Sequence, residues 1–401
     1  MSFSSWTLMH KNIPVADVEL LERNAAIIQV TCIHNINYAP IGTTADNKID
    51  PARLEDWLNK RSIPASRENI DEILEKLNIQ NTRALALKSY GLSLSDQYWI
   101  KPKDVTTIWE RVNFFQNEFS ADIGEILFGD KEVFLSEINF FSPDSSSDGW
   151  LEKKWVIKDS KRILVKGANP LYRQEPFNEK IASDMMKHLG INHIPYELTE
   201  INSKPYSLCE NFITENTELI PAVDIVKNTP QVKGDTRMTH LLRGCGALGM
   251  DSEIIKSEID KMIVIDYLIA NYDRHWRNFG FIRDANTLGW QGFSPIFDSG
   301  ASLWQYHDQI SSDVKSRAFE ETQLEQLKLI TDLSWYEPIQ DKVLCDIIIS
   351  TLDKHPSMQD VRKDTIVQTV TKHASIITEL KRELAPTIVS AQKKFKNNNI
   401  K

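Results

Sequence analysis

Residues 271–280 constrain the fold of this chain more than any other stretch of the sequence. They read Asn-Tyr-Asp-Arg-His-Trp-Arg-Asn-Phe-Gly, and the helix-like apolar run 261–270 comes directly before them. A second polar turn, Phe297-Asp298-Ser-Gly300, follows later in the chain. An Asp, an Asn five positions later and a separate Asp-x-Gly turn form the arrangement that kinase-type phosphoryl transfer uses. The sequence therefore predicts an apolar helix that ends in a polar loop of this kind.

The candidate reactive residues of this motif are Asp273, Asn278 and Asp298. We expect Asp273 to orient a substrate hydroxyl. Because Mg²⁺ prefers oxygen ligands, the amide of Asn278 and the carboxylate of Asp298 are suited to hold Mg²⁺ on nucleotide phosphates. In the alternative interpretation, Asp273 caps a turn and Asn278 lies in a plain loop. The preceding apolar run and the turn at Asp298 favour the functional interpretation.

A histidine, His275, lies between Asp273 and Asn278, and two roles are open to it. It can brace the loop through a hydrogen bond to backbone or to Asp298, or it can act as a general base. We favour bracing, because Asp273 already fills the position that orients the hydroxyl.

A lysine at the end of a predicted strand is the candidate phosphate-binding residue. Lys166 ends the apolar segment Arg162–Lys166. A lysine that leaves a strand can reach nucleotide phosphates when a carboxylate on the next helix holds it, as in the kinase Lys–Glu pair. We prefer Glu179 as this carboxylate over Glu175, because helix-dipole stabilisation alone can explain an acid at Glu175. The alternative for Lys166 is a solvated lysine at a strand end.

A serine-rich turn, residues 145–149, precedes this lysine and reads Ser-Ser-Ser-Asp-Gly. Such a turn can donate backbone N–H groups and hydroxyls to phosphates, and its candidate contacts are Ser146, Ser147 and Gly149. It is neither a G-x-G-x-x-G loop nor a Walker A sequence. A plain serine-rich hairpin is the alternative, and only the position of the turn before Lys166 favours a phosphate loop.

The segment Cys209–Ile213 is a candidate for the adenine side of a nucleotide site. A strand that runs into a junction between lobes can present the backbone groups of Glu210 and Phe212 to an adenine ring. The alternative is a plain core strand.

Composition places the chain among ordinary globular proteins. Its 401 residues allow two or three domains, and 41% of them are hydrophobic. The formal net charge of −9 argues against a broad, direct nucleic-acid footprint. The four cysteines are scattered without a C-x-x-C pair, so we expect buried free thiols in a reducing cytoplasm and no zinc site built from them. We find neither a signal peptide nor a membrane span, and we expect a cytoplasmic protein.

Periodicity divides the chain into three regions. Residues 1–130 are predicted to form a mixed α+β subdomain, with strands within Val15–Thr44 and helices within Asp50–Leu87. Residues 131–216 are predicted to form a β-rich lobe, with strands between Phe134 and Lys166 and one helix that Gly190 stops. Residues 217–401 are predicted to be helical. The expected fold class is therefore α+β, with a β-rich part before an all-α lobe.

These motifs, in this order, resemble the HipA-like serine/threonine protein kinases, which are the toxin partners in HipBA-type toxin–antitoxin systems. The resemblance rests on Ile163-Leu-Val-Lys166, Asn178-Glu179, the loop 271–280 and Phe297-Asp298-Ser-Gly300. It covers the chain from about Phe134 onward. It implies a two-lobed kinase-like fold that uses ATP and Mg²⁺.

The resemblance also implies a role for each matched residue. Asp273 corresponds to the catalytic aspartate, and Asn278 and Asp298 correspond to the metal ligands. Lys166 corresponds to the phosphate-binding lysine, and Glu210 with Phe212 corresponds to the adenine-side strand.

The family further implies partners and a regulatory modification. Its characterised members phosphorylate an aminoacyl-tRNA synthetase, and they pair with a small helix-turn-helix antitoxin that binds operator DNA. DNA would thus be contacted only through that partner. Members also phosphorylate a serine in their own phosphate loop, and Ser145, Ser146 and Ser147 lie in the corresponding stretch.

Two departures separate this chain from the best-known members. The phosphate-loop stretch is richer in serine and poorer in Gly, Ala and Gln, and the first 130 or so residues match the prototype poorly. Two other functions therefore stay open: a weak or inactive kinase fold that acts with a helix-turn-helix repressor, and a small-molecule kinase. An intact set of Lys166, Asp273, Asn278 and Asp298 argues against the inactive module.

Overall fold

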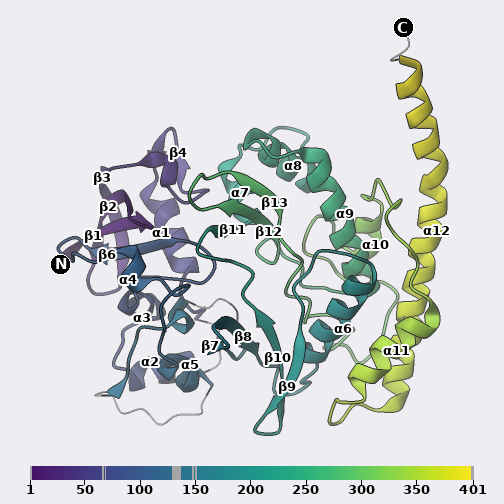
Figure 1. Cartoon of the computed structure of the whole chain (residues 1–401), viewed down its shortest axis with the longest axis horizontal. Coiled ribbons are helices and arrows are strands. Elements are labelled where there is room, and N and C mark those ends of the chain that lie inside the picture. The colour runs from purple at the N-terminus through teal and green to yellow at the C-terminus, as the bar shows by residue number, and fades with distance from the viewer. Residues whose placement is uncertain are drawn as a thin grey trace. The chain divides into compact units, whose positions relative to one another are not determined.

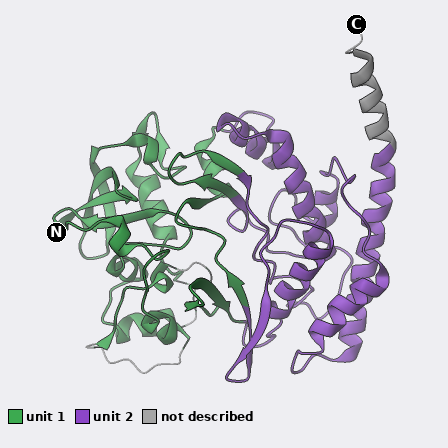
Figure 2. Ribbon diagram, in the orientation of Figure 1, with its two compact units in different colours: residues 1–167, 208–230, 281–291 green, residues 168–207, 231–280, 292–401 purple. Residues whose placement is uncertain are grey.

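The computed structural model describes residues 2–65, 67, 69–128, 137–146, 149 and 151–398, with side chains through residue 385. The chain forms two compact units, and each unit is assembled from three separate segments (Figure 2). Unit 1 contains residues 1–167, 208–230 and 281–291, whereas unit 2 contains residues 168–207, 231–280 and 292–401. The division at 130 and 216 that periodicity suggests stays a prediction.

A four-stranded antiparallel sheet, in the order β3-β2-β1-β6, begins unit 1 (Figure 1). Its strands are β1 (Phe3–His10), β2 (Ile13–Leu21), β3 (Ala26–Ile33) and β6 (Tyr98–Pro102). Helix α1 (Pro51–Lys60) packs into the same apolar cluster, where Leu54 and Leu58 meet Leu8 and Leu20. The Asp50 carboxylate accepts from the N–H groups of Ala52 and Arg53, so α1 starts with a capping residue followed by proline.

Short helices and small sheets complete unit 1. The antiparallel pair β7–β8 belongs to a sheet in the order β7-β8-β10-β9, whose last strand, β9 (Glu197–Ile201), is counted with unit 2. A further sheet has the order β11-β12-β13. The remaining elements up to residue 293 that lie wholly or partly in this unit are β4 (Thr44–Ala45), β5 (Lys48–Ile49), α2 (Ile70–Lys76), α3 (Thr82–Lys88), α4 (Trp109–Val112), α5 (Asp122–Leu127), β7 (Lys153–Lys158), β8 (Lys161–Lys166), β10 (Lys204–Glu210), β11 (Thr217–Pro221), α7 (Ala222–Asn228), β12 (Gly280–Asp284) and β13 (Trp290–Phe293).

A buried polar cluster joins distant segments within unit 1. The Glu218 carboxylate accepts from Arg283 Nε at 2.6 Å and lies 3.3 Å from His10 Nε2. Arg283 also donates to the hydroxyl of Tyr98 at 3.0 Å. All four side chains are almost fully shielded from solvent. Because a buried charge is costly unless it is paired, these residues must assemble together.

Helices dominate unit 2. The buried helix α9 (Ser252–Leu268) starts at Asp251, whose carboxylate accepts from the N–H groups of Glu253 and Ile254. Ten of its residues are buried, which is consistent with its long apolar run. The other elements of unit 2 are α6 (Glu175–His188), β9 (Glu197–Ile201), α8 (Arg237–Ala247), α10 (Gln323–Leu327), α11 (Asp341–Leu352) and α12 (Asp360–Asn398).

The predicted α+β class is confirmed, and so are most predicted elements. Helix α6 ends at His188, and Gly190 follows with a φ of +65°, as expected for a glycine stop. Among the described residues between Phe134 and Lys166, the strand prediction is confirmed for β7 and β8 and is wrong for residues 137–146, which form a 3-10 turn (Pro143–Ser146) and irregular chain. Residues 134–136 of the predicted strand region lie outside the described residues. Residues 217–401 are not all helical as predicted, because strands β11, β12 and β13 lie within them and pair with one another in one sheet.

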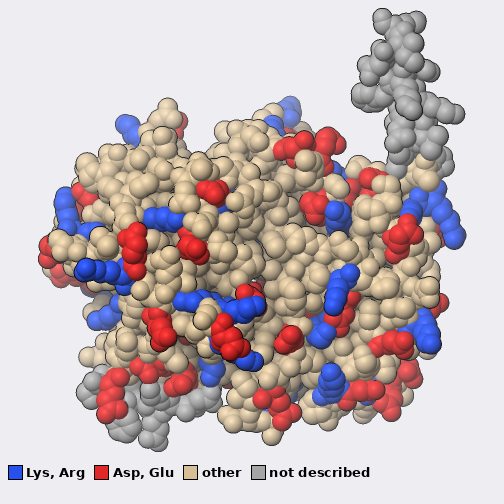
Figure 3. All heavy atoms as spheres, in the orientation of Figure 1, with Lys and Arg blue, Asp and Glu red and all other residues tan. Residues whose placement is uncertain are grey.

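Charges of both signs are interspersed over the face shown in Figure 3, which has no broad basic area among its described residues. This agrees with the net charge of −9. Within the part of the chain that the structure describes, none of the helices combines the length and apolarity that crossing a membrane requires.

Candidate active site

The loop after α9 is organised by a buried arginine. Arg274 pairs with Asp266 of α9, with Nε 2.9 Å from Oδ2, and both side chains are almost fully buried. Asp266 Oδ1 also accepts from the side-chain amide of Asn271 at 2.8 Å. The loop is therefore tied back to the last turns of the helix that precedes it.

The same guanidinium joins the loop to the second polar turn. Arg274 Nη1 donates to the carbonyl oxygens of Asn278 at 2.8 Å and Phe297 at 2.6 Å, and Nη2 donates to Ser299 Oγ at 3.1 Å. One side chain thus holds the backbone of Asn278, the backbone of Phe297 before Asp298 and the side chain of Ser299 after it. The structure brings these two predicted site residues together through Arg274, which the sequence analysis did not single out.

Asp273 lies at the exposed edge of this loop, with its side chain 32% exposed. Its backbone N–H donates to Asn271 Oδ1 at 3.1 Å, and its carbonyl accepts from the N–H of His275 at 2.7 Å. Its carboxylate is paired with the guanidinium of Arg317. Arg317 lies on the turn between Lys315 and Thr322, which form an isolated antiparallel bridge. Hydrogen bonds within the loop therefore hold its backbone, whereas the Asp273 carboxylate contacts an exposed arginine side chain.

The imidazole of His275 is held by backbone contact. Its Nδ1 accepts from the N–H of Arg277 at 3.3 Å. Burial lowers the pKa of His275, although the carboxylates of Asp273 and Asp298 oppose this shift. The ring is therefore neutral at pH 7. These contacts are those of a residue that braces the loop, and its role stays a prediction.

The two candidate metal ligands present oxygen atoms of different kinds. The side-chain amide of Asn278 donates through Nδ2 to the carbonyl of Asp273 at 3.1 Å, so Oδ1 is its ligand atom. Asp298 has a φ of +58°, a conformation that Asp tolerates better than most residues. Its N–H donates to the hydroxyl of Tyr196 at 3.3 Å. A carboxylate and an amide oxygen make a donor set that fits Mg²⁺.

Helix α6 packs closely against the Asp298 turn. The amide of Asn178 donates to the carbonyl oxygens of Gly300 and Ser302, both at 2.8 Å. A Cβ atom on Gly300 would lie 3.3 Å from the side chains of both Glu175 and Glu179, which explains a glycine at this position. The Asp-x-Gly turn therefore fits against the helix that carries both candidate acids.

The two candidate acids on α6 have different surroundings. Glu175 accepts from the hydroxyl of Tyr306 at 2.5 Å and from the N–H of Asn169 at 3.2 Å. Glu179 is buried and accepts from the hydroxyl of Ser207. Both acids therefore accept hydrogen bonds from neighbouring segments, and the preference for Glu179 as the lysine partner stays a prediction.

The remaining candidates belong to unit 1. Lys166 ends β8, opposite Lys153 in the antiparallel pair, and only 8% of it is exposed. Glu210 ends β10 and is exposed, with its carboxylate 2.7 Å from Lys161 Nζ. The N–H of Asn211 donates to the carbonyl of Arg162 at 2.8 Å, and Phe212 follows, half-buried. A buried lysine at a strand end differs from the solvated lysine of the alternative reading.

The serine turn is more buried than a solvent-exposed loop would be. Ser145 and Ser146 are both buried, and the hydroxyl of Ser146 donates to the carbonyl of Leu92 at 2.6 Å. The carbonyl of Gly149 accepts from Arg67 Nη2 at 2.9 Å. Ser147 lies outside the described residues. The described part of the turn is therefore anchored to unit 1 at both ends.

A buried acid next to this turn should make the stability of unit 1 depend on pH. Burial raises the pKa of Asp144 to about 7, although hydrogen bonds from the Trp155 N–H and the Ser142 hydroxyl lower it. In the unfolded chain an Asp has a pKa of about 3.9. Between this pKa and that of the folded state, the folded protein binds one proton more than the unfolded chain, so the free energy of unfolding falls as pH rises. Relative to Asp144→Asn, the wild type should lose about 4 kcal/mol of unfolding free energy across this window.

Urea unfolding at pH values from 4 to 8 measures this difference. Asp104→Asn, which changes an exposed Asp of the same unit, is the control and should follow the wild type. Parallel pH profiles for the wild type and Asp144→Asn would contradict the assignment.

Comparisons with known proteins agree with this geometry. Residues 141–357 match the family described as the HipA-like C-terminal domain. The serine/threonine-protein kinase CtkA of Helicobacter pylori is 27% identical over 143 residues, which are 35% of this chain and 44% of that protein. The match thus spans less than half the length of that relative.

A solved structure matches nearly the whole chain. It is the Shewanella oneidensis HipA toxin–antitoxin protein in a complex with HipB and operator DNA, and it is 12% identical. The match covers 94% of this chain and 99% of the HipA chain with a TM-score of 0.59. At this identity the match shows a common fold. Since the family match covers more than half of the sequence and includes the loop 271–280, this chain belongs to the HipA-like C-terminal domain family.

Proposed function

We propose that this protein is an ATP- and Mg²⁺-dependent serine/threonine protein kinase. The observation that carries the proposal is the Arg274 network, which holds the Asp273–Asn278 loop and the Asp298 turn to one side chain. Phosphoryl transfer asks mainly for positioning and for neutralisation of charge. A rigid, oxygen-lined arrangement of this kind supplies both.

The proposed role of each residue follows from the atoms that its side chain or backbone presents. Asp273 would orient a substrate hydroxyl and accept its proton. Asn278 Oδ1 and the Asp298 carboxylate would hold Mg²⁺, which when bound neutralises charge on the phosphates of ATP. Lys166 would contact phosphates, with Glu179 as its partner. Glu210 and Phe212 would present backbone groups to adenine, and Ser146, Ser147 and Gly149 would line the phosphate loop.

The relatives support a protein acceptor and a DNA-binding partner. The CtkA relative is a serine/threonine kinase, which supports a protein hydroxyl as the acceptor. An aminoacyl-tRNA synthetase is the proposed substrate. The Shewanella HipA structure contains HipB and operator DNA, which supports a helix-turn-helix antitoxin as partner and DNA contact only through that partner. The proposed location is the cytoplasm.

Incorporation of ³²P from ATP into a protein tests the proposal. We expect Mg²⁺-dependent labelling of the protein itself or of an added synthetase. Label in a small-molecule extract with none in protein would point to a small-molecule kinase and would contradict the proposal.

A catalytically silent binding module is the second candidate, and the Arg317 contact favours it. A substrate hydroxyl that uses the Asp273 oxygen now bound by Arg317 must displace that guanidinium. Calorimetric titration with Mg-ATP separates the two candidates, because a silent module shows neither heat nor a thermal shift. Binding with turnover would rule the module out.

Autophosphorylation of the serine turn is a further expected result. Ser145 and Ser146 are buried, so the turn must leave its position before either hydroxyl can receive phosphate. A phosphate adds about two negative charges and would prevent Ser146 from returning to Leu92. Mass spectrometry after incubation with ATP should find phosphate on this turn and none there in a Ser145→Ala, Ser146→Ala, Ser147→Ala protein. Phosphate only at other sites would refute the assignment.

A further inference from the structure

Three side chains with different metal-binding atoms meet on strands β2 and β3 of unit 1. Asp17 on β2 and Cys32 on β3 are partners in the antiparallel register. His34 comes two residues after Cys32, and its N–H still donates to the carbonyl of Val15 at 2.9 Å as in a continuing ladder. Cross-strand partners and residues two apart share a face, which explains why the three side chains converge. Their candidate ligand atoms lie within 4.8 Å of one another.

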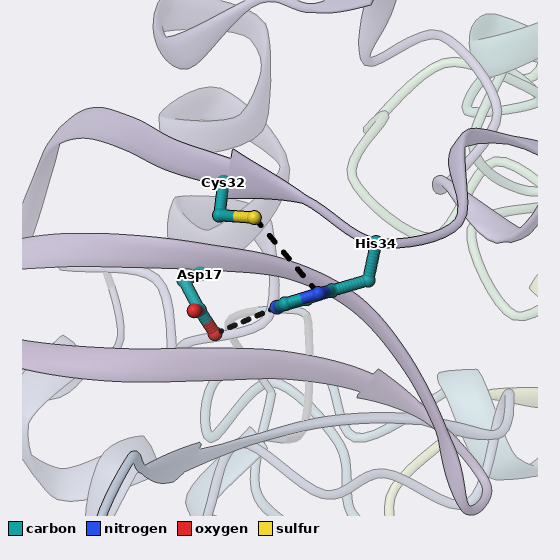
Figure 4. A group of neighbouring side chains, drawn as sticks. All are labelled: Asp17, Cys32 and His34. Carbon is teal, nitrogen blue, oxygen red and sulfur yellow. Dashed lines mark hydrogen bonds and ion pairs between the residues drawn. The ribbon is translucent and has the colours of Figure 1, made fainter.

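The orientation of the His34 ring decides which of its nitrogens can bind a metal. Figure 4 shows the ring between the Cys32 sulfur and the Asp17 carboxylate. Nε2 lies 3.1 Å from Asp17 Oδ1, and Nδ1 lies 3.9 Å from Cys32 Sγ. Because an ionised carboxylate only accepts hydrogen bonds, Nε2 carries the proton. A neutral ring then has its lone pair on Nδ1, on the side of the sulfur.

Asp17 is placed to orient the imidazole rather than to bind an ion itself. It is buried, and its Oδ1 also accepts from the Thr7 hydroxyl at 2.8 Å. Its Oδ2 accepts from Lys103 Nζ at 2.7 Å. Both carboxylate oxygens are therefore already engaged. A carboxylate that fixes the tautomer of a histidine is the usual outer partner of a metal-binding imidazole.

The spacing of the two open ligand atoms suits a tetrahedral ion of the zinc class. Bonds of about 2.3 Å to sulfur and about 2.1 Å to nitrogen, at a tetrahedral angle, separate the ligand atoms by about 3.6 Å. The observed 3.9 Å needs a shift of a few tenths of an ångström. Cys32 is exposed, so the expectation of a buried thiol is wrong at this position. The His34 side chain is 35% exposed, so an ion can reach both residues from solvent. Thiolate and imidazole favour Zn²⁺ over Mg²⁺ or Ca²⁺.

We propose that Cys32 and His34 form a transition-metal site of the zinc class, with Asp17 as the positioning residue and the remaining ligand positions open to water. The pair lies outside residues 141–357, and the kinase proposal does not use it. On binding, the Cys32 thiol gives up its proton to solvent as the metal–sulfur bond forms. The spacing of the cysteines does not predict this site, because one of its two ligands is a histidine.

Cobalt absorption tests the site without any assay of activity. Co²⁺ added to the full-length protein should produce the near-ultraviolet thiolate-to-cobalt band, and Zn²⁺ should displace it. Asn278 and Asp298 contain no sulfur, so Co²⁺ at the proposed kinase site cannot produce this band. Cys32→Ser should abolish it, whereas the control Cys345→Ser, which changes a half-buried thiol in unit 2, should retain it.

Two further variants test the assigned roles. His34→Ala should remove Co²⁺ binding at this site, and Asp17→Asn should weaken it about 10–100-fold while the thiolate band persists. The metal site is overturned if the wild type shows no band or if Cys32→Ser retains it. An unchanged affinity in Asp17→Asn would overturn the positioning role. Far-ultraviolet circular dichroism of each variant checks that the fold is kept.

Discussion

Asp273→Asn is expected to lower phosphate transfer by about 10²–10⁴-fold, because the amide cannot accept the proton of the substrate hydroxyl. The substitution keeps the size of the side chain and leaves the backbone bonds of Asp273 to Asn271 and His275 in place. The fold and the affinity for Mg-ATP should therefore change little. Initial rates of ³²P transfer, with calorimetric titration of nucleotide, measure the two effects separately.

A matched control for this variant lies in the same unit. Asp235 also pairs with an arginine, Arg243, at 2.5 Å, and it is not part of the proposed site. Asp235→Asn should transfer phosphate at the wild-type rate. If Asp273→Asn labels as fast as Asp235→Asn, Asp273 is not the residue that acts on the hydroxyl.

Arg274→Ala should destabilise unit 2 by about 3–5 kcal/mol, because it leaves the buried Asp266 carboxylate without its cation. It also removes the donors to the carbonyl oxygens of Asn278 and Phe297. We therefore expect the loop and the Asp298 turn to separate, with loss of phosphate transfer. Urea unfolding measures the stability, and hydrogen exchange of residues 271–300 shows whether the effect is local.

Arg317→Ala is the control for this second variant. It breaks another Arg–Asp pair of the same loop, but Arg317 is 60% exposed, and exposed pairs contribute at most about 1 kcal/mol. A double variant, Asp266→Asn with Arg274→Met, removes both buried charges and should recover part of the lost stability. Equal effects of Arg274→Ala and Arg317→Ala on stability would show that burial of the Arg274 pair does not organise the loop.

Local sequence patterns predicted the helices that are marked by apolar periodicity or by a capping residue. The apolar run before Asn271 indicated α9, and Pro51 after Asp50 indicated the start of α1. The same motif spacing selected Asp273, Asn278 and Asp298 as one set, and the structure holds their segments together through Arg274.

Contacts between distant segments were out of reach of such patterns. In the sequence, nothing distinguishes Arg274 from the other polar residues of its loop, because its partners Asp266 and Phe297 lie outside the loop. The pairing of Arg317 with Asp273 likewise depends on a turn that comes later in the chain. Strand β6 was not predicted, because its pairing partner β1 comes from the beginning of the chain. In each case the deciding interaction joins residues far apart in the sequence, so the local spacing of apolar and polar residues does not predict it.

The polar cluster of unit 1 has a consequence for synthesis of the chain on the ribosome. His10 is made early, but it is buried against Glu218, whose carboxylate is neutralised by Arg283. During translation His10 therefore gains its buried partner only after a strand more than two hundred residues later has emerged, when a segment of unit 2 is already outside the ribosome. A nascent chain stalled before Arg283 would hold Glu218 without its cation, so we expect it to stay sensitive to protease until residue 291 has emerged.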